Sequence, residues 1–196
     1  MTPTPSYTSF DGHRCIANGS LQDNALAVKK ALESHAAGPV LIFDDATGRS
    51  IDVDTRGTDE EVVARLTALV AAERSRNDAP ESAPPRGRGR PRLGVVPREV
   101  TLLPRHWEWL AAQPGGASVA LRKLVEEARR ANSGKDKTRR AQERAYYFML
   151  AMAGNLPGFE EATRALFAGE PLKVRELIAT WPDDVREYAM KLAKRS

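Results

Sequence analysis

Residue types that carry catalysis or bind soft metals are scarce in this sequence. It has one cysteine, Cys15, and three histidines, so an internal disulfide and a zinc site built from cysteines are both excluded. No serine or cysteine stands in a nucleophile motif such as Gly-x-Ser-x-Gly. The segment Gly12–Gly19 contains no glycine-rich phosphate loop. We therefore predict that the protein is not an enzyme and uses no metal and no cofactor.

Long hydrophobic runs are also missing. No apolar stretch approaches the roughly 20 residues that a membrane-spanning helix needs. The first residues show no basic region followed by an apolar one, which is the pattern of a secretion signal. We therefore expect a cytoplasmic protein that does not associate with a membrane.

One cluster of acidic residues suggests the alternative that the protein binds a metal ion. Asp44, Asp45, Asp52 and Asp54 lie on both sides of a predicted hairpin, and hard cations bind clustered carboxylates. Their spacing does not follow the calcium loop of an EF-hand. Acidic residues beside a turn are more often simply solvated, and we favour that interpretation.

The first third of the chain predicts a small α+β domain over residues 1–73. Short alternating segments predict strands, and Asp11-Gly12 predicts a hairpin turn between the first two. Either Ser20 or Asp23 can cap the first helix, and Thr58 with Glu61 forms a capping box for the second. The expected order is β-β-α-β-β-α, over residues 7–10, 13–17, 24–35, 40–43, 51–53 and 59–73.

Positive charge is concentrated in the middle of the chain. Residues 1–85 hold 8 Lys and Arg against 13 Asp and Glu, a net charge of −5, whereas residues 86–144 hold 15 against 6, a net charge of +9. The remaining residues are neutral overall, with seven of each sign. Such clustering favours a polyanionic partner, although a solvated basic surface without a partner would have the same composition.

A linker rich in proline and arginine covers residues 74–97. Its segment Arg88-Gly-Arg-Pro-Arg92 resembles the core of an AT-hook, a short element of DNA-binding proteins. The resemblance implies that Arg88 and Arg90 enter an A·T-rich minor groove, where the negative potential is strongest. Gly89 would allow the backbone to approach closely, Pro91 would direct the chain outward, and Arg86 and Arg92 would contact phosphates. A bare flexible tether is the alternative.

Residues 98–130 resemble a ribbon-helix-helix unit, the fold of many small bacterial repressors. A strand over 98–103 would end at Leu103-Pro104, and two helices over 105–113 and 118–130 would be joined by a glycine turn at Gly115-Gly116. The resemblance implies a homodimer formed through the 98–103 strand, with Arg98 facing outward and Ser118 capping the second helix beside a phosphate. The outward set Arg98, Val100 and Leu102 departs from the polar pattern of a base-reading ribbon. Packing of the strand and hairpin into the protein's own core is the alternative.

The rest of the chain predicts a helical bundle over residues 135–196. We expect the preceding helix to break at Ser133-Gly134 and a new helix to begin near Asp136. A basic face of this helix would carry Lys137, Arg139 and Arg140, and three proline-started helices would follow over 157–168, 171–181 and 182–194. The fold class is therefore α+β, with a small N-terminal α+β domain, a basic linker, and a mostly helical C-terminal region containing one short strand.

As a whole, the chain resembles a bacterial family known as domain of unknown function 2239. The resemblance is carried by GRPRLGVVPREVTLLPRHWEWLAAQPGGASVALRKLVEEARR and by MAGNLPGFEEATRALFAGE, and it implies no activity. We predict a DNA-binding protein, either a transcriptional regulator or a nucleoid-associated factor. The alternative is a protein–protein interaction module whose arginine-rich segment is only a tether and which binds no nucleic acid.

Overall fold

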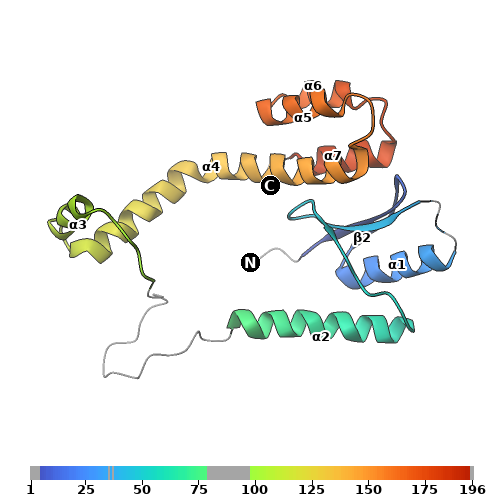
Figure 1. Cartoon of the computed structure of the whole chain (residues 1–196), viewed down its shortest axis with the longest axis horizontal. Coiled ribbons are helices and arrows are strands. Elements are labelled where there is room, and N and C mark those ends of the chain that lie inside the picture. Colours follow the sequence, from blue (N-terminus) through green and yellow to red (C-terminus); the bar gives the residue numbers. More distant parts are fainter. Residues whose placement is uncertain (1–4, 35, 37, 79–97, 195–196) are drawn as a thin grey trace. The chain divides into compact units, whose positions relative to one another are not determined.

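A computed structural model describes residues 5–34, 36, 38–78 and 98–194 of the chain (Figure 1). The chain divides into two compact units. Unit 1 combines residues 1–77 with residues 135–196, and unit 2 consists of residues 78–134. Unit 1 therefore unites segments from both ends of the chain, and unit 2 is the segment between them.

Unit 1 contains a four-stranded antiparallel sheet with the strand order β2-β1-β3-β4. Successive side chains of a strand point to opposite faces of the sheet. Ser9 of the first strand donates to Asn24 on one face, and Phe10 packs into an aromatic core on the other. The strands are β1 (Tyr7–Asp11), β2 (Arg14–Gly19), β3 (Val40–Asp44) and β4 (Ser50–Ile51).

Two helices with capping boxes belong to the N-terminal half of unit 1. Helix α1 (Leu21–Glu33) begins after Ser20, whose hydroxyl accepts a hydrogen bond from the backbone of Asp23, so Ser20 and not Asp23 is the cap. Helix α2 (Asp59–Asp78) has the predicted box between Thr58 and Glu61. It packs through Val62 and Leu66 against α1 and Val53. The sequence-predicted order β-β-α-β-β-α is confirmed.

The C-terminal helices of unit 1 cover the other face of the sheet (Figure 1). Phe43 of β3 meets Phe148 with ring centroids 4.9 Å apart, and Phe148 meets Tyr188 at 4.6 Å. All of these rings are buried, so the sheet and the helices share one hydrophobic core. The sequence analysis separated the two parts by a linker over residues 74–97 and did not predict that they share this core. The helices after residue 153 are α5 (Phe159–Ala168), α6 (Pro171–Leu177) and α7 (Asp183–Leu192).

Unit 2 contains a helical hairpin. Helix α3 (Pro104–Ala111) has the proline at its first turn, where the missing amide donor costs nothing. The turn follows the sequence prediction, because Gly115 and Gly116 both have positive φ, at 87° and 74°. Helix α4 (Gly116–Ala153) begins directly after this turn and continues into unit 1.

The strand predicted over residues 98–103 is not formed, since these residues are in neither a strand nor a helix. A β-strand is stabilised by hydrogen bonds to a neighbouring strand, and none of the described strands pairs with this segment. The predicted alternation therefore has no ladder to support it within one copy of the chain. The fold class remains α+β, with the described strands confined to the N-terminal sheet.

The helix break predicted at Ser133-Gly134 is also wrong, because α4 runs through it without interruption. A single glycine inside a helix costs only about 1 kcal/mol relative to alanine. The flanking turns offset this cost with ion pairs one turn apart, such as Arg130 with Glu126 at 2.9 Å and Arg139 with Asp136 at 3.4 Å. Strong helix-forming residues on both sides thus override the local break signal.

Candidate nucleic-acid interface

The sequence-predicted contacts divide into those inside and those outside the described residues. Arg86, Arg88, Gly89, Arg90, Pro91 and Arg92, which form the arginine arm, lie outside them. The described residues are Arg98 and Ser118 in unit 2, and Lys137, Arg139 and Arg140 in unit 1. Arg98 is exposed at the start of the described part of unit 2.

Ser118 does not cap the second helix of the hairpin. Helix α4 begins at Gly116, so Ser118 lies within the first turn and its carbonyl accepts a hydrogen bond from Arg122 Nε at 3.1 Å. Amides in the first turn of any helix have no acceptor within that helix. The backbone amides at the start of α4 can therefore still donate to a phosphate, as predicted. Ser118 itself lies inside the helix and does not cap it.

The part of α4 in unit 2 carries a basic face that the sequence analysis did not identify. Arg122, Lys123, Arg129 and Arg130 are all exposed. At about 100° per residue they fall within roughly one third of the helix circumference. Glu126 lies on the same face and binds both Arg129 and Arg130, and its arginine partners lower the pKa of this carboxyl. The face thus combines four cations with one carboxylate.

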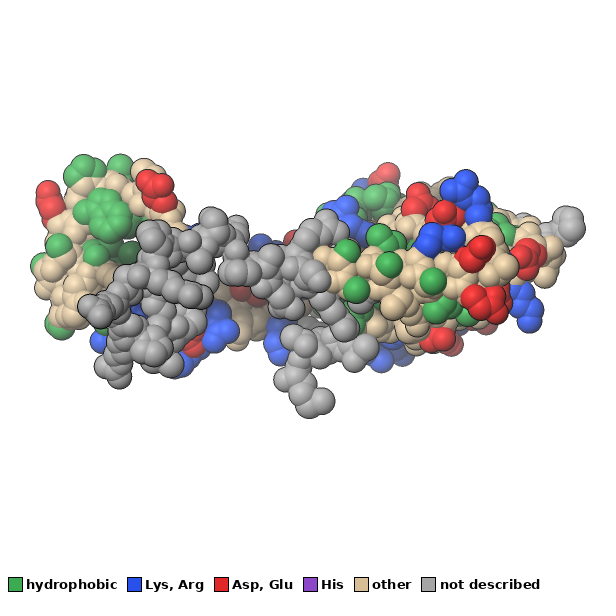
Figure 2. All heavy atoms as spheres, turned by 90° about the horizontal axis from the view of Figure 1, so that it is seen from below, with side chains coloured by type: hydrophobic (Ala, Val, Ile, Leu, Met, Phe, Trp, Pro, Cys, Tyr) green, Lys and Arg blue, Asp and Glu red, His purple; other side chains and the backbone are tan. Residues whose placement is uncertain are grey.

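The opposite side of the same helix is apolar and largely uncovered. Leu110 and Ala120 are the buried apolar residues of the described part of unit 2. Trp107 is 41% exposed, and Val125 is 64% exposed. Figure 2 shows hydrophobic side chains, in green, on the surface of the part that contains α3. The other large exposed apolar residues of unit 2 are Val100, Leu103, Trp109 and Leu124.

Lys137, Arg139 and Arg140 do not form one surface. Arg139 lies about 100° around the helix from Arg140, and it pairs with Asp136 and with Glu143, at 3.4 and 3.9 Å. Lys137 and Arg140 are exposed on the remaining side of α4. Of the predicted trio, these two have positive charges that no described carboxylate neutralises at ion-pair distance.

The acidic hairpin is explained by contacts within the protein. Asp44 accepts hydrogen bonds from the amide of Ala46 and the hydroxyl of Thr47, at 2.9 Å each, which is the usual role of an aspartate at a turn. Asp54 binds Arg56 through both carboxylate oxygens. Within the described residues no group of three or more possible ligands could hold a metal ion. The metal alternative therefore finds no support at this hairpin.

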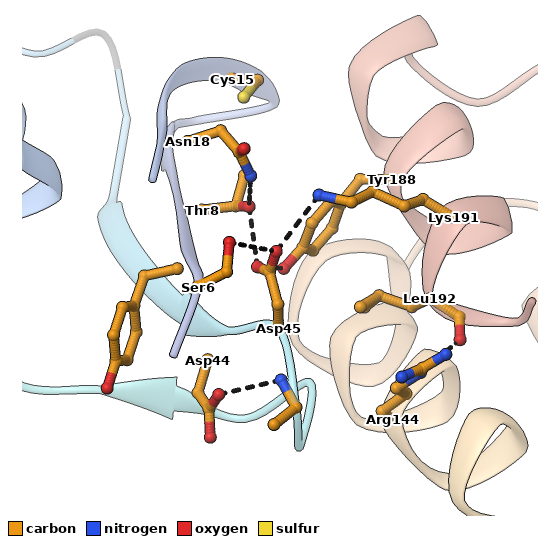
Figure 3. A network of polar contacts seen from close by, with 12 residues as sticks. Ser6, Thr8, Cys15, Asn18, Asp44, Asp45, Arg144, Tyr188, Lys191 and Leu192 are labelled. Carbon is orange, nitrogen blue, oxygen red and sulfur yellow. Dashed lines mark hydrogen bonds and ion pairs between the residues drawn. The ribbon is translucent and has the colours of Figure 1, made fainter. Parts of the chain in front are cut away.

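Asp45, from the same hairpin, is the centre of a polar network that joins the sheet to α7 (Figure 3). Its carboxylate accepts hydrogen bonds from Ser6 at 3.1 Å, Thr8 at 2.8 Å and Tyr188 at 2.5 Å. Lys191 completes the network with Nζ 3.1 Å from Oδ2. Burial alone would raise the pKa of Asp45, but the hydrogen bonds from Tyr188, Thr8 and Lys191 outweigh it and lower the pKa below 3.8.

Residues 6–193 match a family described as an uncharacterized protein conserved in bacteria, DUF2239. The chain belongs to this family. Comparison with curated proteins and with solved structures finds no significant match. The family match covers the N-terminal sheet, the basic middle segment and the C-terminal helices, so DUF2239 comprises both units and is not restricted to one of them.

In the described residues of this DUF2239 chain no helix is long and apolar enough to cross a membrane. The described part of unit 2 presents cations and apolar side chains on opposite sides of one helix. The periodicity of residues 122–130 was sufficient to find the basic face, since the cations recur at intervals of seven and eight residues.

Proposed function

We propose that the protein binds DNA through the arginine arm and unit 2, as a transcriptional regulator or a nucleoid-associated factor. The observation that carries this proposal is the exposed basic face of Arg122, Lys123, Arg129 and Arg130 on α4. The arm, residues 86–92, ends 30 residues before Arg122 in the same chain. Lysine and arginine side chains that contact phosphates release condensed counterions, which supplies much of the affinity for DNA.

The two parts would contribute differently. The arm Arg88-Gly-Arg-Pro-Arg92 would supply A·T preference, because narrow A·T minor grooves attract inserted arginines. The α4 face would contact phosphates, which position a protein on the duplex without reading its sequence. Arg98 and the first turn of α4, which contains Ser118, would add to the contacts of unit 2.

A salt titration of duplex binding tests both parts in the full-length protein. The wild type should bind an A·T-rich duplex more tightly than a G·C-rich one, with an affinity that falls steeply as salt rises. Replacing Arg88 and Arg90 by alanine should remove the preference. Replacing Arg122 and Lys123 by alanine should lower the salt slope by about 0.9 for each lost phosphate contact while the preference remains.

The matched control removes two positive charges elsewhere. Arg164 and Lys173 are exposed and lie in ion pairs within unit 1, so R164A/K173A should leave the preference and the slope unchanged. Absence of wild-type binding at low salt contradicts the DNA proposal. Equal loss of slope in the control shows that net charge alone decides binding.

We further propose that the DNA-binding form is a homodimer through residues 98–103. Val100 and Leu103 are each about half exposed, and none of the described strands of the same copy pairs with residues 98–103. Pairing with the same segment of a second copy would satisfy the backbone and cover apolar side chains. Sedimentation should show a dimer for the wild type and a monomer for Val100→Lys. Leu172→Lys, at an exposed apolar residue of unit 1, should remain dimeric.

The alternative function, a protein–protein interaction module, is favoured by the same exposed apolar surface of unit 2. Large exposed apolar patches commonly mark binding sites for other proteins. This alternative predicts no DNA affinity at physiological salt and an unchanged fold after deletion of residues 79–97. The salt titration distinguishes the two functions directly.

A further inference from the structure

A groove with a strongly positive lining lies in unit 1. It has a volume of about 520 Å³. Its walls come from α6, from α7 and from the residues that follow α7. The lining contains four cations, one carboxylate and one methionine: Arg175, Arg186, Lys191, Lys194, Glu187 and Met190.

Two of the four cations have structural partners within unit 1. Arg186 donates to the carbonyl of Ala179 at 3.0 Å and pairs with Asp183 at 2.8 Å. Lys191 pairs with Asp45, as Figure 3 shows. The charges of these two side chains are therefore partly neutralised by carboxylates.

The other two cations lack such compensation. Arg175 and Lys194 are exposed, and their side chains have no hydrogen bond or ion pair to any of the described residues. Each lies near the C-terminal end of a helix, where a positive charge interacts favourably with the helix dipole. That effect explains each residue separately. It does not explain why two helix ends bring both charges to one groove, because like charges repel.

The chemistry of the lining favours phosphate. A guanidinium binds two phosphate oxygens at once, and an ammonium adds a point charge with three donors. Glu187 is the one carboxylate of the lining, so an anionic ligand would meet a net positive surface. Arg175 and Lys194 are both exposed, so a phosphate within a long polyanion could reach them.

We propose that the α6–α7 groove binds a backbone phosphate of DNA through Arg175 and Lys194. This inference rests on the proposed DNA-binding function and adds a contact in unit 1 to those of the arm and unit 2. Arg186 and Lys191 would flank the phosphate while keeping their structural bonds. The contact is independent of base sequence.

The test compares R175A/K194A with wild type and with R164A/K173A, all as full-length chains, in the duplex salt titration. R175A/K194A should reduce the slope of log affinity against log salt by about 0.9, because the two cations contact one phosphate. The A·T preference should be unchanged, and R164A/K173A should keep the wild-type slope. A slope for R175A/K194A equal to that of wild type overturns the inference while leaving the proposed function intact.

Titration with inorganic triphosphate, followed by NMR shifts of the amides of residues 174–194, separates the two proposals further. Shifts in wild type that disappear in R175A/K194A support a phosphate site even if the duplex is not bound. Absence of shifts in wild type overturns the site. Binding of an oligoglutamate peptide at the groove, with no effect of R175A/K194A on DNA, assigns the groove to an acidic protein segment and overturns the DNA assignment.

Discussion

Replacing Tyr188 by phenylalanine should destabilise unit 1 by a predictable amount. The substitution removes one hydroxyl and retains the ring, which packs against Phe10 and Phe148. The lost hydrogen bond joins the hydroxyl to the Asp45 carboxylate at 2.5 Å. It connects α7 with the β3–β4 turn, so its loss weakens the contact between the sheet and the C-terminal helices.

The magnitude follows from the groups that remain. A hydrogen bond to a charged group contributes about 1.5–3 kcal/mol. Asp45 keeps its bonds to Ser6, Thr8 and Lys191, so no buried acceptor is left without a donor. We therefore expect the lower end of the range, about 1.5 kcal/mol of unfolding free energy. Asp45→Asn should cost more, because it weakens all four interactions at once.

Urea unfolding provides the assay, with the emission of Trp181 as the probe of unit 1. Trp181 is buried, whereas Trp107 and Trp109 belong to unit 2, so both proteins should carry Trp107→Phe and Trp109→Phe. A difference below about 0.5 kcal/mol at neutral pH would refute this account, since that is less than an ordinary neutral hydrogen bond contributes.

The pH dependence gives a second check on the same bond. The pKa of Asp45 in the folded protein lies below its ordinary value of 3.8. Its stabilising contribution is therefore complete above the unfolded pKa and is lost as pH falls through the folded one. The stability difference between wild type and Tyr188→Phe should accordingly shrink below about pH 4. An equal difference at low and neutral pH would show that the ionised carboxylate is not the partner.

Three glycine substitutions test other features of the fold by thermal unfolding. Gly48→Ala should lower the unfolding free energy by more than 2 kcal/mol, because φ is +67° and the added Cβ would lie 1.8 Å from the carbonyl oxygen of Arg144. Gly116→Ala should cost about 1 kcal/mol, because φ is +74° but no other atom lies within 4 Å of the added Cβ. Gly134→Ala should stabilise by up to about 1 kcal/mol and raise the helical circular dichroism signal, since the site is inside α4 and has open space. A loss of helix in Gly134→Ala would contradict a continuous α4.

Local signals in the sequence predicted much of the N-terminal half. The capping box at Thr58 placed the start of α2 correctly, because a cap depends on residues only three positions apart. The glycine turn at Gly115-Gly116 was predictable for the same reason. The start of α1 was predicted at residue 24, with Ser20 or Asp23 as the cap, whereas the helix begins at Leu21 after Ser20. The break expected at Ser133-Gly134 failed because stability summed over several flanking turns exceeded one unfavourable residue.

The candidate sites also include one part that the sequence predicts and one part that it does not. Charge clustering in the middle of the chain was visible from composition, and the basic face of α4 follows from helical periodicity once the helix is known. The α6–α7 groove was not predictable. Arg175 and Lys194 are far enough apart in sequence that only the packing of α6 against α7 brings them to one surface.

The sequence by itself determined membership of the DUF2239 family, the order of the secondary-structure elements up to α2 and the concentration of positive charge, since each depends on residue identity or short spacing. The tertiary structure decided that the two ends of the chain share one core. It also decided that Asp45 binds Tyr188, 143 residues later, instead of remaining a solvated turn residue. The physical reason is that burial of Phe10 and Phe43 requires apolar partners, and the N-terminal segment alone does not supply enough of them to cover both faces of its sheet.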